Sequence, residues 1–233
     1  MRECYFVNFT REAIRVSLSR RVGIIECGVY EAYKGIAVLY TEYFEIAYAT
    51  VLRCEYSGIL ILGSRWGVVH DYGVYNSSPG IYLSCSREVT LDMITLVFNE
   101  RKGMYLSCSS EVLVHRCLVE RSKGVGLYAT CVNRLIVDVS AFYSNNRHGV
   151  HLSMTDEVFI SRSLIYDNRI SGLYVEDSKK LSVNRCSMES NGRSGVWADR
   201  SELFMGGNFI IGSGEGVRVS DTRALLRYNL IIN

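Results

Sequence analysis

The sequence predicts an all-β solenoid, in which short strands repeat at a fixed interval and stack into one elongated domain. Three observations lead to this prediction. A glycine recurs about once every 23 residues, apolar residues alternate with polar ones after each glycine, and hydroxyl and amide side chains return at the same places between the apolar runs. A fixed interval of this length is typical of repeat architectures, whose units bury their apolar faces only by stacking on one another.

The register of the repeat is set by nine glycines and by Ala13, which takes the place of the glycine one unit earlier. The glycines are Gly35, Gly58, Gly80, Gly103, Gly126, Gly149, Gly172, Gly195 and Gly216. Successive positions are 21 to 23 residues apart. This small variation indicates one repeated structural unit with minor changes in its loops.

Each unit contains three short runs with the pattern of β-strands. One and three residues after the register position the side chain is apolar, as at Val150 and Leu152, and the same alternation returns nine and eleven residues after it, as at Val158 and Ile160. Alternation with period two is the pattern of a strand with one buried face. An apolar residue sixteen positions after the register residue, such as Ile165, marks a third and shorter strand.

Hydroxyl and amide residues mark the corners between these strands. A Ser or Thr stands six residues after the register position in every unit except one, where Val132 replaces it. Asparagines stand four residues before the next glycine, with Ser122 interrupting their column; they are Asn76, Asn99, Asn145, Asn168 and Asn191. A hydroxyl can bond to nearby backbone and close a turn, and asparagine tolerates left-handed backbone and can pair with the same residue in the next unit.

Three strands per unit and no helical periodicity predict a right-handed parallel β-helix. We expect one domain over residues 1–233, in which residues 1–12 are the remnant of an incomplete unit, and a spacing of about 4.8 Å between neighbouring turns. A leucine-rich repeat would need the pattern L-x-x-L-x-L-x-x-N, which is absent, and usually has one strand per repeat. Since no amphipathic capping helix is evident, we expect a fragment of a longer protein, or ends that are closed by flanking domains or a second copy.

Composition and charge argue against several classes of partner. The net charge is +2 and the basic residues are dispersed, whereas a nucleic-acid-binding protein usually carries a basic stripe. The apolar residues are spread evenly, and no run is long enough to span a bilayer. The first residues lack the features of a secretory signal peptide. We therefore predict neither a nucleic-acid partner nor a membrane span.

The repeated unit G-h-x-h-x-x-S/T and the junction N-x-x-x-G, seen at 145–149 and 168–172, resemble the right-handed parallel β-helix (pectin-lyase-like) superfamily. The resemblance begins at about Ala13. It implies this fold, favours an extracellular or cell-envelope location, and allows a range of functions: pectate lyases, polygalacturonases, alginate epimerases, phage tailspikes, a periplasmic copper-site accessory family and non-catalytic repeat domains. The catalytic motifs of polygalacturonases, epimerases and calcium-dependent lyases are absent, so the resemblance assigns no catalytic residue.

Aromatic side chains occupy the outward position two residues after the glycine in six consecutive units. They are Tyr82, Tyr105, Tyr128, His151, Tyr174 and Trp197, and Arg218 follows in the next unit. Such a row could stack against sugar rings and bind a linear polysaccharide or glycoconjugate. Alternatively, the rings stabilise the sheet through contacts with one another, or lie beneath a partner.

Two acidic residues, Glu176 and Asp199, stand four residues after successive glycines and should lie on adjacent strands, about 5 Å apart at the backbone. Two close carboxyl groups can differ in pKa and act as acid and as base or nucleophile, as glycosidases require. These residues, flanked by His151 and Arg218, are therefore candidate catalytic residues of a polysaccharide lyase, hydrolase or epimerase. Alternatively, they form a solvated acidic edge that pairs with Arg200 and Arg218.

Six of the eight cysteines fall into two columns of the repeat. The first column is Cys85, Cys108 and Cys131, and the second is Cys27, Cys117 and Cys186. We expect free structural thiols. Stacked thiols could also bind a soft metal, but no C-x-x-C spacing is present, and we predict neither a metal site nor a cofactor.

The sequence thus predicts a β-helix that binds a polysaccharide or glycoconjugate, and it leaves open whether the protein is also an enzyme. One alternative is a non-catalytic structural or interaction scaffold. A second alternative is an accessory protein for metal delivery.

Overall fold

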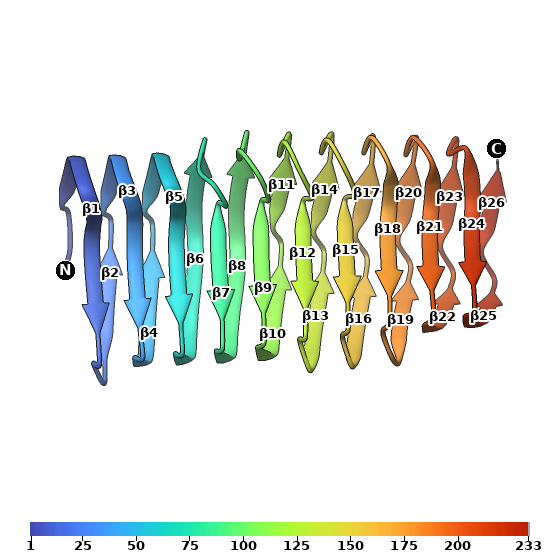
Figure 1. Ribbon diagram of the computed structural model, residues 1–233, viewed down its shortest axis with the longest axis horizontal. Helices are drawn as coiled ribbons and strands as arrows, with labels where there is room; N and C mark the ends of the chain where they lie inside the picture. The colour runs from blue at the N-terminus through green and yellow to red at the C-terminus, as the bar shows by residue number, and fades with distance from the viewer. Residues whose placement is uncertain (233) are drawn as a thin grey trace.

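The computed structural model describes residues 1–232; Asn233, the last residue of the predicted domain, lies outside the described residues. The described chain forms 26 strands and contains no helix. The strands coil into turns that stack along one long axis, with the two termini at opposite ends (Figure 1). Neighbouring turns pair with one another in parallel. The predicted all-β, parallel β-helix fold is confirmed.

The turns present three faces, and each turn contributes a strand, or part of a long strand, to each face. The first face contains the strands that follow the register glycines: β7 (Ile81–Ser84), β9 (Met104–Ser107), β12 (Leu127–Thr130), β15 (Val150–Ser153), β18 (Ser171–Glu176), β21 (Ser194–Asp199) and β24 (Glu215–Ser220). The second face contains β2 (Val22–Ile25), β4 (Glu42–Ala47), β10 (Ser110–His115), β13 (Arg134–Asp138), β16 (Glu157–Ser161), β19 (Leu181–Asn184), β22 (Glu202–Gly206) and β25 (Arg223–Arg227).

The third face has the shortest strands: β11 (Leu118–Glu120), β14 (Ala141–Tyr143), β17 (Leu164–Tyr166), β20 (Ser187–Glu189), β23 (Phe209–Ile211) and β26 (Leu230–Ile232). In the N-terminal half, five long strands continue around a corner from one face to the next: β1 (Tyr5–Ser17), β3 (Gly28–Leu39), β5 (Thr50–Leu62), β6 (Arg65–Tyr75) and β8 (Arg87–Val97). Part of the predicted remnant, residues 5–9, pairs in register with the beginning of β3.

Each turn bends at three corners, and each corner places one residue in the left-handed backbone region. In the turn that starts at Gly149 these residues are Met154, Arg162 and Asp167, with φ angles of 51°, 49° and 53°. At most corners the next residue points a small polar side chain inward, although Val132, Tyr72 and Ile94 take this buried position at three of them. The backbone N–H of the polar residue donates to the side chain of the next turn, as from Thr155 to the hydroxyl of Ser178 at 3.2 Å. This agrees with the predicted role of the hydroxyl column.

The buried asparagines form a continuous ladder, which we call the amide ladder: Asn145, Asn168 and Asn191. The amide nitrogen of Asn145 donates to the Oδ1 of Asn168 at 3.0 Å, and that of Asn168 donates to the Oδ1 of Asn191 at 3.0 Å. Ser122 interrupts the ladder, as predicted. Its side chain is too short to accept from Asn99, whose Nδ2 has no partner among residues 1–232.

Asn76 does not belong to this column, so the prediction that included it was wrong. Asn76 is exposed at the corner itself, with φ of 52°, and Ser77 takes the buried position, where its N–H donates to the Oδ1 of Asn99 at 3.2 Å. The unit between Gly58 and Gly80 has one residue fewer after its corner than its neighbours. Counting back from the glycine therefore misplaces the corner by one residue.

The inward columns form one continuous apolar core along the axis. Ile81, Leu83 and Leu91 have no exposed surface, and full burial of such a side chain contributes about 2 kcal/mol. The last turn differs, because Leu226 and Ile231 are each 43% exposed. That a partner, a second copy or further chain covers such a surface stays a prediction.

Candidate functional site

The six predicted aromatic residues lie in one row on the first face, on β7, β9, β12, β15, β18 and β21. Each is the register partner of the next across neighbouring strands, and Arg218 of β24 pairs with Trp197. All six side chains are half-buried. We call this row the aromatic column; its members are Tyr82, Tyr105, Tyr128, His151, Tyr174 and Trp197.

Neighbouring rings of the aromatic column stack on one another. The ring centroids of Tyr82 and Tyr105 are 4.8 Å apart, and the planes differ by 3°. From Tyr128 to Trp197 successive centroids are 4.7 to 4.8 Å apart, and the planes are tilted by 52° to 58°. The ring faces therefore contact other rings, which stabilises the sheet, and a ligand would meet ring edges and hydroxyl groups rather than a flat platform.

Three cationic side chains cover parts of the aromatic column. The Nζ of Lys102 lies 3.7 Å from the ring centroid of Tyr105 and 3.9 Å from that of Tyr128. The guanidinium carbons of Arg193 and Arg218 lie 4.4 Å and 4.8 Å from the ring centroid of Trp197. Burial, together with the nearby charge of Arg101, lowers the pKa of Lys102 to about 8. The first face thus presents positive charge over the second and third rings of the column and over its last ring.

A polar cluster lies where the column changes from tyrosine to histidine. The Nε2 of His151 is 3.2 Å from the Oε1 of Glu176, and the hydroxyl of Tyr174 donates to the Oε2 at 2.9 Å. His148, from the corner before β15, stacks on Tyr174 with centroids 4.9 Å apart and contacts His151 edge-on. The structure therefore brings His151, Tyr174 and Glu176 together, as the sequence predicted, and adds His148.

These contacts determine the charges of the cluster. Burial raises the pKa of Glu176, but hydrogen bonds from Tyr174 and His151 outweigh it, so that this pKa is lowered. Burial lowers the pKa of His151, although Glu176 opposes the shift, and it lowers the pKa of His148 to about 3. Burial and the contact with Glu176 raise the pKa of Tyr174 to about 12. At neutral pH the cluster thus holds an ionised carboxylate, two neutral imidazoles and a protonated phenol.

Glu176 and Asp199 are register partners on adjacent strands, as predicted. Their side chains have different partners, however, because Asp199 pairs with Arg200 rather than with the histidine cluster. The Nε and Nη2 of Arg200 also bind both oxygens of Asp177, at 2.7 Å and 3.0 Å. The two carboxylates are therefore neighbours in the sheet, but each is engaged in a separate polar network.

The two cysteine columns have different environments. Cys27, Cys117 and Cys186 are buried, and burial raises the pKa of Cys117 to about 12. The first column is exposed at a left-handed corner of the first face; it consists of Cys85, Cys108 and Cys131. All eight thiols are free. The expectation of structural thiols therefore holds for the second column, whereas packing in the core does not explain the first.

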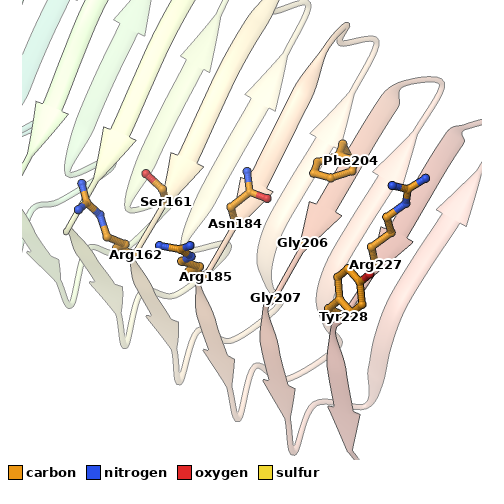
Figure 2. A pocket seen from close by; sticks show the side chains of 9 residues that line it. All are labelled: Ser161, Arg162, Asn184, Arg185, Phe204, Gly206, Gly207, Arg227 and Tyr228. Carbon is orange, nitrogen blue, oxygen red and sulfur yellow. The ribbon is translucent and has the colours of Figure 1, made fainter.

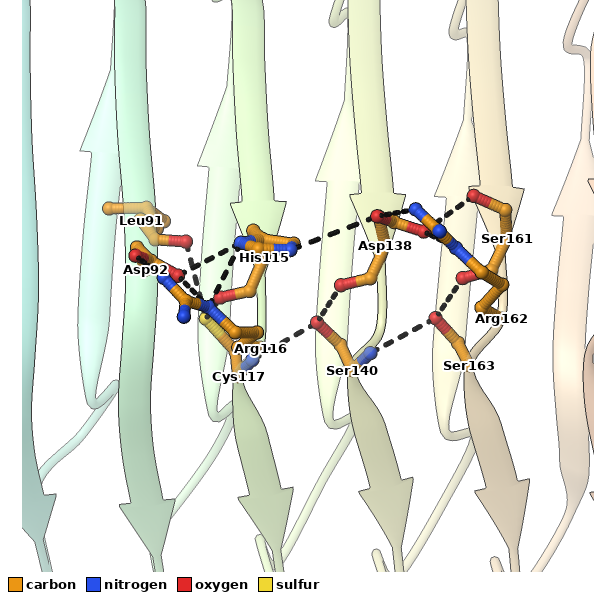
Figure 3. A network of polar contacts seen from close by, with 10 residues as sticks. All are labelled: Leu91, Asp92, His115, Arg116, Cys117, Asp138, Ser140, Ser161, Arg162 and Ser163. Carbon is orange, nitrogen blue, oxygen red and sulfur yellow. Dashed lines mark hydrogen bonds and ion pairs between the residues drawn. The ribbon is translucent and has the colours of Figure 1, made fainter.

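A second polar network lies on the second face, and its residues are not among the predicted site residues (Figure 3). The Nδ1 of His115 is 3.0 Å from Asp92, and its Nε2 is 3.8 Å from Asp138. Arg116 binds Asp92 and Arg162 binds Asp138, so that an arginine neutralises each carboxylate. The hydrogen bond from Arg162 lowers the pKa of Asp138. The sequence did contain a sign of this network, because Asp92, His115 and Asp138 occupy the same outward column on successive strands.

Within the described part of the chain, no group of three or more His, Cys, Asp or Glu side chains is placed to hold a metal ion. No helix over residues 1–232 is long and apolar enough to cross a membrane.

Comparison with known families identifies the repeat. The family described as "Right handed beta helix region" matches residues 57–233, which is more than half of the chain. The chain belongs to the right-handed β-helix family. No curated protein sequence matches this β-helix significantly.

Several solved structures are similar to this β-helix. The periplasmic alginate epimerase AlgG is 15% identical over 93% of this chain and 73% of its own, with a TM-score of 0.59. Tailspike protein 2 of bacteriophage CBA120 is 13% identical over 93% of this chain and 38% of its own, with a TM-score of 0.72. The A-module of the mannuronan C-5 epimerase AlgE6 from Azotobacter vinelandii is 12% identical over 98% of this chain and 83% of its own, with a TM-score of 0.60. At these identities the similarity shows the fold alone.

Proposed function

We propose that this β-helix binds a negatively charged linear polysaccharide or glycoconjugate along the aromatic column of its first face. The observation that carries the proposal is the pairing of a six-ring column with cations that lie on its rings. Lys102 and Arg193 have no carboxylate partner within 4.0 Å among residues 1–232, whereas many other cations of the chain do. Such cations attract acidic groups of a ligand.

The proposed binding should depend on pH through Lys102. Its pKa of about 8 results mainly from burial, which disfavours the charged form. An acidic group bound beside Lys102 would favour that form again and raise the pKa. By linkage, the proposed binding should weaken as the pH rises above about 8, because the lysine then loses its proton in the free protein.

The geometry also bears on the enzymatic form of the proposal. A glycoside hydrolase needs one carboxyl group with a raised pKa to protonate the leaving group, and the pKa of Glu176 is lowered. Neutral His151 and the phenol of Tyr174 instead suit proton removal and return, the chemistry of a lyase or an epimerase. Glu176 would then hold and orient His151, and Asp199, paired with Arg200, would have no direct role. Solved structures with this fold include alginate epimerases.

The two alternative functions rest on particular features. The scaffold is favoured by the mutual stacking of the rings, which stabilises the sheet without any ligand. Metal delivery is favoured by the exposed column of Cys85, Cys108 and Cys131, because thiolates bind soft metals. Neither alternative accounts for the unpaired cations on the rings.

Isothermal titration calorimetry tests the proposal. The protein is titrated with alginate, an acidic polysaccharide, and with dextran, a neutral one. We expect alginate to bind, and the double variant Lys102→Gln/Arg193→Gln to bind it at least about tenfold more weakly, because hydrogen bonds to charged groups contribute about 1.5–3 kcal/mol each. The control Arg134→Gln removes an exposed charge from β13 on the second face and should leave the affinity unchanged.

Equal binding of dextran and alginate, or an unchanged affinity in the double variant, would contradict the proposal. No binding in a broad panel of acidic polysaccharides would favour the scaffold. If binding is found, an unsaturated product, or exchange of a sugar proton with solvent deuterium, would indicate the enzyme. That activity should be lost in His151→Gln.

A further inference from the structure

An open hollow lies on the second face, away from the aromatic column. Its volume is about 610 Å³, and Figure 2 shows the side chains around it. It is open to solvent where β19, β22 and β25 end at the same corner. The predicted polysaccharide site does not use any residue of this hollow.

The hollow exists because one turn lacks two side chains that its neighbours have. In the outward column, Asn184 is followed by Gly206 and then by Arg227. At the adjoining corner, Arg185 is followed by Gly207, whose φ is 62°. The neighbouring turns therefore form walls, and the two glycines form the floor.

Both glycines keep this space open. A Cβ on Gly206 would lie 2.7 Å from the Oδ1 of Asn184, which is closer than real contacts allow. A Cβ on Gly207 would meet only the Cγ of Arg185, at 3.9 Å, so a side chain there would extend into the hollow. Gly207 also has the left-handed conformation that other residues adopt at some cost.

The walls carry positive charge that the protein does not neutralise. Arg162, at one edge, is paired with Asp138 in the network of Figure 3. Arg185 and Arg227 have no carboxylate within 4.0 Å among residues 1–232, although both line the hollow. Two unpaired guanidinium groups in a concave surface form a site for an anion, and a planar guanidinium binds a carboxylate through two parallel hydrogen bonds.

The remaining lining indicates what the anion belongs to. Phe204 is 38% exposed and Tyr228 is 94% exposed, so that each offers a ring to an apolar ligand surface. Asn184 and Ser161 also line the hollow and carry hydrogen-bonding groups. A sugar ring has apolar C–H faces and hydroxyl edges, and a uronic acid adds one carboxylate. Cations, rings and polar groups together match that combination.

We propose that the hollow at Gly206 and Gly207 binds a uronic acid residue, with Arg185 or Arg227 on its carboxylate and with Phe204 or Tyr228 against its ring. This site goes beyond the proposed function, because it lies on another face and does not require any binding at the aromatic column. A polymer held on the first face would leave it free for a second chain or for a short oligosaccharide.

Titration with a trisaccharide of uronic acids, in the Lys102→Gln/Arg193→Gln background, tests the site without interference from the first face. We expect binding, and a loss of at least about tenfold in affinity when Arg185→Gln and Arg227→Gln are added. The control Arg223→Gln removes a charge from the same strand, β25, outside the hollow and should have no effect. Gly206→Ala should weaken binding without any change of charge.

Three outcomes would overturn the proposal. Binding of a neutral glucose trisaccharide with equal affinity would show that the charge plays no part. Unchanged binding after loss of both arginines would place the ligand elsewhere. Full displacement of the trisaccharide by equimolar inorganic phosphate would indicate a simple anion site that does not recognise a sugar. Binding at the hollow with no alginate binding at the aromatic column would contradict the function proposed above while leaving this inference intact.

Discussion

The amide ladder inside the helix and the aromatic column outside it are built in the same way but differ in composition. Each places one side chain per turn on a line parallel to the axis, and in each the neighbours contact one another. In the amide ladder the same residue recurs, because each asparagine must both donate to the next turn and accept from the previous one. In the aromatic column histidine replaces tyrosine at residue 151 and tryptophan replaces it at residue 197, and cations cover some of the rings.

This difference shows where a solenoid can carry function. An inward column must satisfy buried polar groups, so a change there leaves a donor unpaired, as Ser122 does to Asn99. An outward column is not restricted in this way, and its composition can follow a ligand. The departure from simple repetition at His151, Tyr174 and Glu176 is therefore the most informative feature of the first face.

The largest effect that we expect concerns His148, which packs against the aromatic column but is buried like a core residue, with 9% of its surface exposed. The unfolded chain takes up a proton at this histidine below pH 6.5, whereas the folded protein does so only near pH 3. Stability should therefore fall as the pH falls from 6.5 towards 3. Between pH 7 and pH 4 the loss from this residue should be about 3 kcal/mol.

Urea unfolding of the wild type and of His148→Phe at pH 7 and pH 4 measures this loss. The variant should lose about 3 kcal/mol less than the wild type over the same interval, because it has no proton to gain. His148→Gln should behave similarly, since it also does not titrate. If all three proteins lose equal stability between pH 7 and pH 4, His148 has the same pKa in the folded and unfolded states. The conclusion that burial lowers this pKa would then be wrong.

A smaller effect should follow from completing the amide ladder. In Ser122→Asn the new Oδ1 can accept from the unpaired Nδ2 of Asn99, and the new Nδ2 can donate to the Oδ1 of Asn145, as in the next turns. A satisfied hydrogen bond contributes about 1 kcal/mol, so the midpoint of urea unfolding should rise accordingly. Binding at the first face should not change.

Ser122→Ala is the matched control, because it removes a buried hydroxyl that has no partner but cannot pair with Asn99. Its stability should lie below that of the asparagine variant. If the alanine variant is as stable as the asparagine variant, the interruption of the ladder does not reduce stability. Inward columns would then tolerate an unpaired amide as readily as outward columns tolerate a change of residue.

Most of the fold could be predicted from the sequence, because in a stacked repeat each structural requirement recurs at the same position of every unit. The alternation around Val150 and Leu152 gave the first strand, and the hydroxyl and amide columns gave the corners. Asn76 was misplaced because its unit lost one residue after the corner, and no pattern in a single unit marks where such a loss falls.

The candidate site was less predictable, because the strand register determines which residues are neighbours but not which partner each side chain turns towards. The sequence placed Glu176 beside Asp199, and only the structure shows that the first turns to His151 and the second to Arg200. Lys102 and Arg193 lie outside the strand columns, so their positions over the rings could not be read from the repeat. The hollow at Gly206 and Gly207 results from missing side chains, and glycine carries no functional group that would mark such a site in the sequence.

The most direct test of the central claim locates a bound polysaccharide on the protein by carbene footprinting with and without alginate. We expect labelling to fall at Tyr105, Tyr128 and Trp197. It should stay unchanged at Tyr143 and Tyr166, which stack on the third face with centroids 4.7 Å apart and no cation over their rings among residues 1–232. Equal protection of both stacks, or none at the aromatic column while alginate is bound, would contradict the central claim.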